Sequence, residues 1–252
     1  MPDGKKKKSA KLLPIPDMQF IKIKTRKFLP PKDNLEELFQ KHLPALKEGD
    51  VLFITSKVLA IHQGRCVKVT EKTDKQFLVR KEADEYLPKT RLTIKNNVFV
   101  SNAGIDASNG NGYLVFWPKN IQPTLKKIWL SLKQKNKIKN LGLVLTDTHS
   151  TPLRFGTVGT AIGSFGLEPL LDYRGKGDVF KRPLKFTRVN LLDSLSAMAV
   201  LLMGESSEST PLLILRGADF IKFTDKPAYH KIIVKRKADS FWPMLKVFKP
   251  LK

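Results

Sequence analysis

The chain has 252 residues, of which 41% are hydrophobic and 9% aromatic, a composition that excludes a disordered protein and suits one large domain or two small ones. Its single cysteine, Cys66, excludes an intramolecular disulfide and a cysteine-rich zinc site, and no apolar run approaches the about 20 residues that span a bilayer. The formal net charge of +23 invites a nucleic-acid interpretation, but a basic protein suits small anionic substrates equally well.

Both ends of the chain are strongly basic. Residues 1–17 contain a lysine run and lack the apolar segment of a secretory signal, so they predict a flexible tail on a cytoplasmic protein that makes no membrane contact. Residues 222–252 are predicted to be a basic C-terminal extension. The folded body is therefore expected over residues 18–221.

The first hundred residues contain several patterned segments. Residues 20–24 alternate as a strand, and residues 51–54 are a continuous apolar run typical of a buried strand. Between them, Asp33 and Glu36 have capping-box spacing at the start of a helical pattern. The pattern then predicts a helix over residues 76–90 and an extended segment over residues 92–100.

The second half of the chain predicts a basic helix at about residues 123–135, followed by a strand that ends at Asp147. A strongly apolar helix is expected over residues 191–203, and a final core strand over residues 212–217. Between Asp147 and the apolar helix, four glycines allow close approach either of a phosphate or of a neighbouring helix: Gly156, Gly159, Gly163 and Gly166. Strands in runs, with helices between them and no clean βαβ repeat, predict an α+β fold with mixed or antiparallel sheets and packed helices.

Two aspartates stand where apolar, strand-like runs stop. Asp106 follows the run at residues 98–100, and Asp147 follows the run at residues 141–145. Carboxylates that strand ends carry into one crevice are a usual means of holding a divalent cation beside phosphates. Each aspartate alone would more simply form a turn or cap a helix, but the two together favour a binding site.

Other chemistry finds less support. The sequence has no G-x-S-x-G, no P-loop and no dinucleotide-binding fingerprint, and its four histidines lack metal-ligand spacing. A loop-like region offers Asp178 with Arg174 and Arg182, whose guanidinium groups suit carboxylates and phosphates, although structural Arg–Asp pairs are the simpler explanation. Glu205 lies just past a helix end, where either a bound cation or exposure to water would explain a negative charge.

An ordered set of motifs resembles the coenzyme F420-0:L-glutamate ligase family. Each motif is several residues long, and the set extends from about residue 20 to about residue 220. The motifs lie at residues 49–58, 63–65, 103–109, 146–148, 159–163, 172–175, 178, 203–204 and 216–217. By this resemblance, residues 18–221 are a catalytic domain with the family's α+β fold.

The resemblance implies a homodimer that uses GTP and two divalent cations, Mg²⁺ or Mn²⁺, to join L-glutamate to the carboxylate of an anionic acceptor. It implies that Asp106 and Asp147 hold one cation, and that Thr148 and Glu205 contact the second. The nucleotide contacts that it implies are Phe28, Leu29, Ser56, Lys57, Asn109, Met203 and Gly204.

Amide formation from a carboxylate needs activation, which a nucleotide γ-phosphate provides as an acyl phosphate. Because donor, acceptor and nucleophile are all anionic, Lys57, Arg174 and Arg182 are expected to supply counter-charges. Asp178 is a candidate general base.

The sequence also departs from the family pattern. Ile61 replaces a nucleotide-contacting lysine, residues 149–151 lack the usual Gly and Arg after Thr148, and Glu205 stands where glutamine is common. These changes leave the acceptor open between an F420-0-like molecule and a folate-like one, the latter being attributed to divergent bacterial members of the family. They also motivate an alternative hypothesis, a catalytically degenerate protein of this fold that binds RNA or another polyanion through its basic surface and tails.

Overall fold

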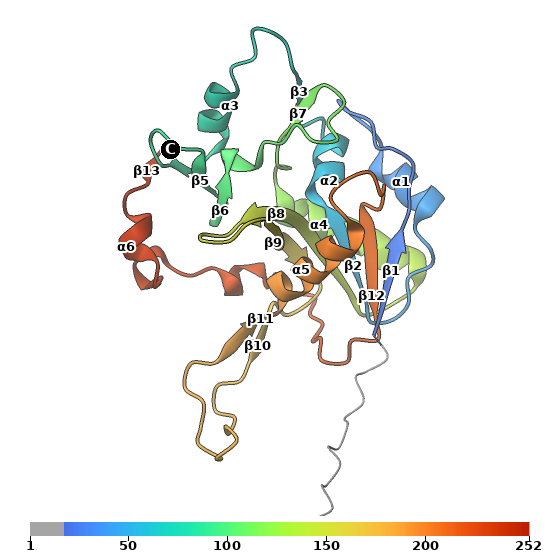
Figure 1. Cartoon of the computed structure of the whole chain (residues 1–252). Coiled ribbons are helices and arrows are strands. Elements are labelled where there is room, and N and C mark those ends of the chain that lie inside the picture. The colour runs from blue at the N-terminus through green and yellow to red at the C-terminus, as the bar shows by residue number, and fades with distance from the viewer. Residues whose placement is uncertain (1–17, 252) are drawn as a thin grey trace, which may run out of the picture.

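A five-stranded sheet lies at the centre of the molecule (Figure 1). The computed structural model describes residues 18–251, so the tail predicted over residues 1–17 lies outside the described residues. In order across the sheet, the strands are β1 (Gln19–Ile23), β12 (Leu212–Arg216), β2 (Asp50–Thr55), β8 (Leu141–Ser150) and β9 (Thr157–Phe165). Strands β2 and β8 run parallel, and the other neighbours run antiparallel.

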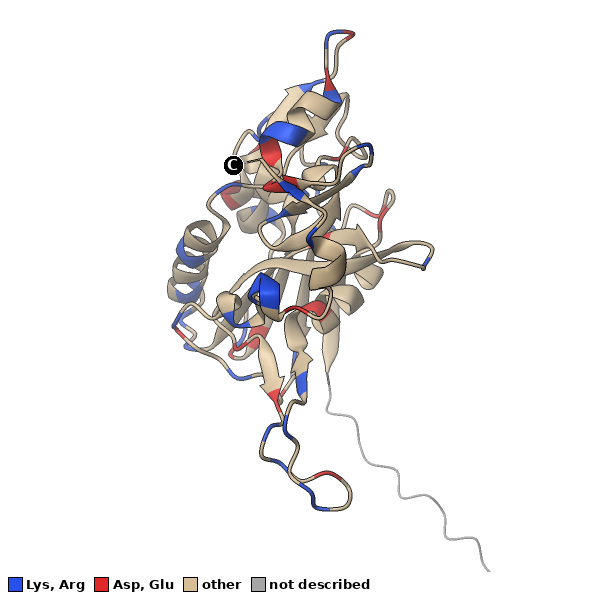
Figure 2. Cartoon of the chain, turned by 90° about the vertical axis from the view of Figure 1, so that its left-hand side faces the viewer, with Lys and Arg blue, Asp and Glu red and all other residues tan. Residues whose placement is uncertain are grey.

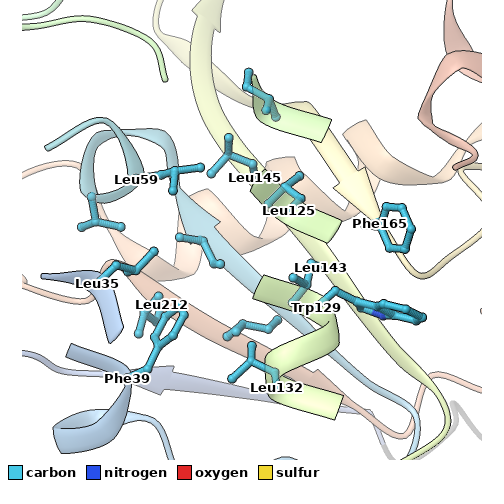
Figure 3. Packing of buried hydrophobic residues seen from close by; sticks show 14 of the residues in the cluster. Leu35, Phe39, Leu59, Leu125, Trp129, Leu132, Leu143, Leu145, Phe165 and Leu212 are labelled. Carbon is cyan, nitrogen blue, oxygen red and sulfur yellow. The ribbon is translucent and has the colours of Figure 1, made fainter. Parts of the chain in front are cut away.

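Helices cover both faces of this sheet. One core cluster packs the sheet against three helices, α1 (Leu35–His42), α2 (Ser56–His62) and α4 (Ile121–Asn136). A second cluster packs the opposite face against α5 (Leu191–Met203). Strand β2 shows why its sequence is a continuous apolar run: Leu52 and Ile54 enter the first cluster, whereas Val51 and Phe53 enter the second. Figure 3 shows side chains of the first cluster between the helices and the sheet.

The glycines of β9 serve helix packing. A Cβ atom at Gly159 would collide with the main chain of α5 at Ser196, and one at Gly163 would collide with Ile121 of α4. Both helices therefore approach the sheet closely, one on each face. Of the two interpretations left open by the glycine spacing, close helix approach describes these two positions.

A smaller sheet lies beside the main one. It contains β13 (Lys249–Pro250), β4 (Glu85–Tyr86), β5 (Leu92–Lys95) and β6 (Val98–Ser101), and helix α3 (Lys75–Glu82) and the 3-10 turn η1 (Asn102–Gly104) adjoin it. Two short pairs complete the strands: β3 (Cys66–Lys68) with β7 (Tyr113–Val115), and β10 (Leu170–Asp172) with β11 (Arg188–Asn190).

The C-terminal extension packs against the body. After β12 it forms η2 (Tyr229–Ile232), η3 (Arg236–Ala238) and α6 (Trp242–Leu245), and it ends as β13, the edge strand of the smaller sheet. The Tyr229 hydroxyl donates to the carbonyl of Ala161, Arg236 forms an ion pair with Glu85, and Phe248 packs edge-on against Phe99. The extension thus connects the main sheet to the smaller one.

Four local expectations are corrected by the structure. The strand predicted to end at Asp147 continues to Ser150, because residues 147–150 pair with β9. Helix α3 ends at Glu82, not near residue 90, because the following residues pair with β5. The extended segment at 92–100 is a hairpin that turns at Asn96 and Asn97, both of which have positive φ. Asn34 rather than Asp33 caps α1, since its side chain accepts hydrogen bonds from two main-chain amides of the first turn.

The mixed sheets with helices packed on both faces confirm the predicted α+β class. Helix α5 has the predicted limits: Asn190 caps its start, and Gly204 ends it with a φ of 83°. Within residues 18–251, no helix is long and apolar enough to cross a membrane.

Candidate functional site

A cavity of about 690 Å³ opens at the carboxyl end of β2, beside residues 146–148 of β8. Strand β2 leads directly into α2, and the last turn of α5 leads into a loop at residues 204–211 that forms another wall. The turn at residues 25–30 and the loop at residues 106–111 complete the lining.

All of the residues that the family resemblance implies for nucleotide and cations line this cavity. They come from five separate segments of the chain and are Phe28, Leu29, Ser56, Lys57, Asp106, Asn109, Asp147, Thr148, Met203, Gly204 and Glu205. Their common location is a geometric result, and their roles stay predictions.

Asp147 lies within β8, just after the pairing register with β9 shifts between Leu145 and Thr146. Its Oδ1 atom accepts a hydrogen bond of 2.8 Å from the main-chain amide of Thr148, and its Oδ2 atom accepts one from Nε1 of Trp117. Burial outweighs these hydrogen bonds and raises the pKa of Asp147 to about 6. The positive charge of Lys57 also lowers this pKa but does not outweigh burial.

Asp106 is held by a lysine and a serine. Lys57, in the first turn of α2, places its Nζ atom 2.7 Å from Oδ2 of Asp106 and 3.0 Å from the hydroxyl of Ser108. The Ser108 amide donates to Oδ1 of Asp106 at 2.9 Å. Burial alone would raise the pKa of Asp106, but the hydrogen bonds from Lys57 and Ser108 lower it. The carboxylate is therefore ionised and lies against the ammonium group of Lys57.

Glu205 follows the glycine that ends α5. Burial raises the pKa of its carboxyl group; the positive charge of Lys57 opposes the rise, and the charges of Asp106 and Glu208 add to it. Nearby, the Asn109 side-chain amide donates to the Ser206 carbonyl at 3.0 Å and so connects the loops that carry Asp106 and Glu205. The cavity therefore gathers mutually repelling carboxylates around one lysine.

This donor set fits Mg²⁺ or Mn²⁺ bound together with phosphates. Within residues 18–251, no three His, Cys, Asp or Glu side chains come close enough to enclose an ion by themselves. Mg²⁺ typically uses one or two carboxylates and completes its octahedron with phosphate oxygens and water. Asp106 and Asp147, with the Thr148 hydroxyl and Glu205 in the same cavity, offer hard oxygen donors of that kind.

The turn at residues 25–30, which lines one side of the cavity, is held by hydrogen bonds to Asp33. Arg26 forms a two-point ion pair with Asp33, with distances of 2.6 and 2.7 Å, and the Leu29 amide donates to the same carboxylate at 2.9 Å. Phe28 packs against the apolar cluster of Ala60, Ile61 and Val115. Ile61, the position where the family pattern has lysine, thus gives the cavity an apolar lining at this point.

The predicted catalytic residues lie elsewhere. Arg174, Asp178 and Arg182 belong to the hairpin that joins β10 to β11, residues 170–190, which we call the arm; it projects from the body (Figure 1). None of the three lines the cavity. The structure of one chain therefore does not bring them together with the predicted nucleotide and cation residues.

Within the arm, the charged side chains pair with one another. Arg174 contacts Asp172, and Arg182 donates to Asp178 at 3.0 Å. Hydrogen bonds from the main chain of Arg182 and of Phe180, and from the Arg182 side chain, hold the pKa of Asp178 below its usual value despite partial desolvation. A carboxylate with a lowered pKa is a weak base, which disfavours the general-base prediction for Asp178 in the isolated chain.

Two residues that contact the predicted cation ligands were not among the predicted site residues. Ser108 lies inside the motif that contains Asp106, so its proximity in sequence was an available signal. Trp117 precedes a proline and resembles an ordinary core residue. Its contact with Asp147, 30 residues away, depends on tertiary packing that no local pattern encodes.

Most of the chain is similar to a protein family and to known enzymes. The F420-0:gamma-glutamyl ligase family model matches residues 22–217. The coenzyme F420:L-glutamate ligase of Methanopyrus kandleri is 30% identical over 81% of this chain and 88% of its own length. The enzymes of that name from Methanocaldococcus jannaschii and Methanococcus maripaludis strain C7 are also 30% identical, over 74% and 82% of this chain and 82% and 90% of their own lengths.

The fold and the matched motifs define a ligase of the kind that adds glutamate to a small-molecule acceptor. The chain belongs to the F420-0:gamma-glutamyl ligase family. The match covers the main sheet, the cavity and the arm, and it stops at the start of the C-terminal extension.

Proposed function

We propose that the protein is a GTP- and divalent-cation-dependent ligase that forms an amide bond between L-glutamate and the carboxylate of an F420-0-like or folate-like acceptor, through an acyl phosphate. Family membership supports the glutamate ligation. The nucleotide, the two cations, the acceptor and a cytoplasmic location are the parts that go beyond it.

One observation carries this proposal: a single cavity collects the lysine, the carboxylates, the Thr148 hydroxyl and the loop after α5 from segments that are distant in sequence. Lys57 offers a positive group to phosphates, and Asp106 and Asp147 offer oxygen ligands to a cation. When bound, the cations would neutralise phosphate charge and stabilise the charge that develops on the transferring phosphoryl group.

In the proposed reaction, an oxygen of the acceptor carboxylate attacks the γ-phosphorus of GTP, and GDP leaves. The amine of glutamate then attacks the carbonyl carbon of the acyl phosphate, inorganic phosphate leaves, and the nitrogen loses a proton. The chain's contribution is positioning. The turn at residues 26–33 lies against the bound nucleotide, and the Lys57 ammonium group contacts Asp106 in the free protein and the phosphates in the complex.

We further propose a homodimer in which the arm of each subunit reaches the cavity of the other. The arm exposes large apolar side chains, including Val179 at 91% and Phe186 at 88% of their full accessible surface. Exposed apolar residues gathered on one projecting element mark an interaction site. Docking on a partner subunit would bury them and would bring Arg174 and Arg182 to the anionic acceptor.

The alternative, binding of RNA or another polyanion, has weaker support. In the view of Figure 2, Lys and Arg are spread over many elements, and Asp and Glu lie among them on several of these elements. A polyanion-binding surface typically concentrates its basic residues. We therefore treat polyanion binding as an outcome of the test.

The test is incorporation of labelled glutamate with GTP and Mn²⁺, run in parallel with the deazaflavin precursor F420-0 and with a folate. We expect a glutamylated product from one of these acceptors, which identifies the acceptor class. A folded protein that makes no product from either acceptor and binds RNA with a steep salt dependence would contradict the ligase proposal and favour the alternative.

A further inference from the structure

Trp117 belongs to the buried core, yet its polar edge is directed at the cavity. The residue follows β7 and is only 1% exposed. Its indole nitrogen donates a hydrogen bond to Oδ2 of Asp147, a residue that lines the cavity. A buried indole N–H requires an acceptor, but a main-chain carbonyl would suffice for that. Here the acceptor is a carboxylate of the proposed cation site.

We propose that Trp117 is a positioning residue for cation binding: its indole N–H fixes the orientation of the Asp147 carboxylate and thereby sets which oxygen lone pairs face the cavity. This inference rests on the proposed cation dependence. Residues that hydrogen-bond a metal ligand orient that ligand, and their loss typically weakens metal binding by about 10- to 100-fold.

The Asp147 carboxylate is held from two sides. The Thr148 amide donates to Oδ1, and Trp117 donates to Oδ2. A third hydrogen bond comes from the Ser56 hydroxyl, at the start of α2. These three donors leave about one of the four lone pairs of the carboxylate for another partner. The carboxylate is consequently prepared to bind a cation without rotating first.

The indole itself is fixed by the structure around it. Nε of Arg65 donates to the Trp117 carbonyl at 3.2 Å, and Arg65 is in turn paired with Glu82 at 2.6 Å. On the other side, a Cβ atom at Gly104 would overlap the indole nitrogen and its neighbouring ring atoms. Only glycine at position 104 leaves room for the indole in its present position. The arrangement is therefore specified by Arg65, by Glu82 of α3 and by the motif that carries Asp106.

Trp129 provides an internal comparison. It is 3% exposed, belongs to the same core cluster, and donates its indole N–H to the Leu141 carbonyl at 2.7 Å (Figure 3 labels Trp129). The two tryptophans thus share burial and a satisfied N–H. They differ in the acceptor, which is a main-chain carbonyl for Trp129 and a cavity carboxylate for Trp117. If both tryptophans served packing alone, replacing either one would have the same effect on stability and on cation binding.

The experiment compares Trp117→Phe with Trp129→Phe in the full chain. Each substitution keeps an aromatic ring and removes one buried N–H, so both variants should lose thermal stability to a similar extent. Binding of Mn²⁺ is measured from the electron paramagnetic resonance signal of the free ion, with and without a non-hydrolysable GTP analogue. We expect Mn²⁺ to bind about 10- to 100-fold more weakly to Trp117→Phe and within about twofold of wild type to Trp129→Phe.

A second variant guards against misfolding of Trp117→Phe. Incorporation of 3-benzothienylalanine at position 117 keeps the size and shape of the indole and replaces only the N–H by sulfur. We expect it to reproduce the loss of Mn²⁺ affinity. Equal Mn²⁺ affinity in wild type, the 117 variants and Trp129→Phe would overturn the inference and leave Trp117 as a packing residue.

The inference and the proposed function fail in different ways. If wild type does not bind Mn²⁺ with or without the nucleotide analogue, both the inference and the proposed cation dependence are overturned. If the 117 variants lose Mn²⁺ affinity but wild type forms no glutamyl product, the positioning role is supported and the ligase proposal is refuted.

Discussion

The cavity and the arm both carry residues expected at the site, but they organise them in opposite ways. In the cavity, Asp106 and Asp147 are held by hydrogen bonds from Lys57, Ser108, Thr148 and Trp117, all fixed by packed elements. In the arm, the arginines are exposed to solvent and pair with nearby aspartates within the same hairpin. The cavity residues come together within a single chain, whereas the arm arginines do not line the cavity of their own chain over the described residues 18–251.

This contrast distinguishes two functions in a ligase for anionic substrates: binding of the cation and nucleotide, and contact with whatever docks on the arm. A cation and a nucleotide need ligands fixed in advance, and rigid elements with buried supports provide them. Side chains on a projecting hairpin become ordered by what docks on it.

The largest expected effect comes from Asp147→Asn. Removing a cation ligand costs several kcal/mol of transition-state stabilisation, which lowers kcat by about 1000-fold or more while the fold is retained. Steady-state glutamate incorporation and a thermal melt measure the two quantities. Asp74→Asn is the control, because Asp74 caps α3 and asparagine caps equally well. Near-normal turnover of Asp147→Asn would refute its assignment as a ligand.

The arm is tested by complementation. We expect Arg182→Ala to lower activity by about 100-fold through a misplaced acceptor. If the arm acts on the partner's cavity, co-expressing Arg182→Ala with Asp147→Asn creates mixed dimers that contain one intact site. Statistical pairing then restores about a quarter of wild-type activity. Absence of any recovery in verified mixed dimers would show that the arm does not act across subunits.

The ion pairs of Glu82, which hold Arg65 against Trp117, are tested by the pH dependence of stability. Burial alone would raise the pKa of Glu82, but ion pairs with Arg65 at 2.6 Å and Lys95 at 2.7 Å outweigh burial and hold it at about 2. Because the folded-state pKa is lowered, this stabilisation is complete above the ordinary value near 4.5 and is lost as the pH falls toward 2.

Glu82→Gln isolates that contribution. The difference in unfolding free energy between wild type and Glu82→Gln should shrink by roughly 3 kcal/mol between pH 4.5 and pH 2, as urea titrations across this range would measure. Glu71→Gln, a substitution in the loop before α3, controls for the change in net charge. A gap that stays constant with pH would mean that the ion pairs do not stabilise the fold as described.

The smallest effect is expected from Lys57→Met. Loss of one charge-assisted contact with phosphate should weaken binding of a GTP analogue by about 10-fold. Lys126→Met, on the exposed face of α4, is the matched control and should leave the affinity unchanged. Isothermal titration measures both. Equal affinities for the analogue in both variants would remove Lys57 from the nucleotide site.

Local signals accounted for much of the fold. The limits of α5 followed from Asn190 and Gly204, which stabilise the two helix ends through their own hydrogen bonding and backbone conformation. The end of α3 did not follow, because the residues after Glu82 pair with β5, and that pairing is decided by distant residues. The predicted helix over residues 76–90 reflected propensity, and tertiary pairing overrode it.

The same distinction holds at the site. That Asp106 and Asp147 share a cavity followed from two runs that each end in an acid. The hydrogen bond from Trp117 to Asp147 could not be predicted from the sequence, because it depends on the space that Gly104 leaves for the indole. The position of the arm could not be predicted either, because turn residues determine a hairpin but not the direction in which it projects.

The most direct test of the proposed reaction is its stoichiometry: inorganic phosphate released from GTP and glutamate incorporated into the acceptor, measured in one reaction with Mn²⁺. An acyl-phosphate ligase that uses the described cavity releases one phosphate for each amide bond formed, and both products disappear in Asp147→Asn. Amide formation without phosphate release, or phosphate release that persists unchanged without glutamate and acceptor, would contradict the account.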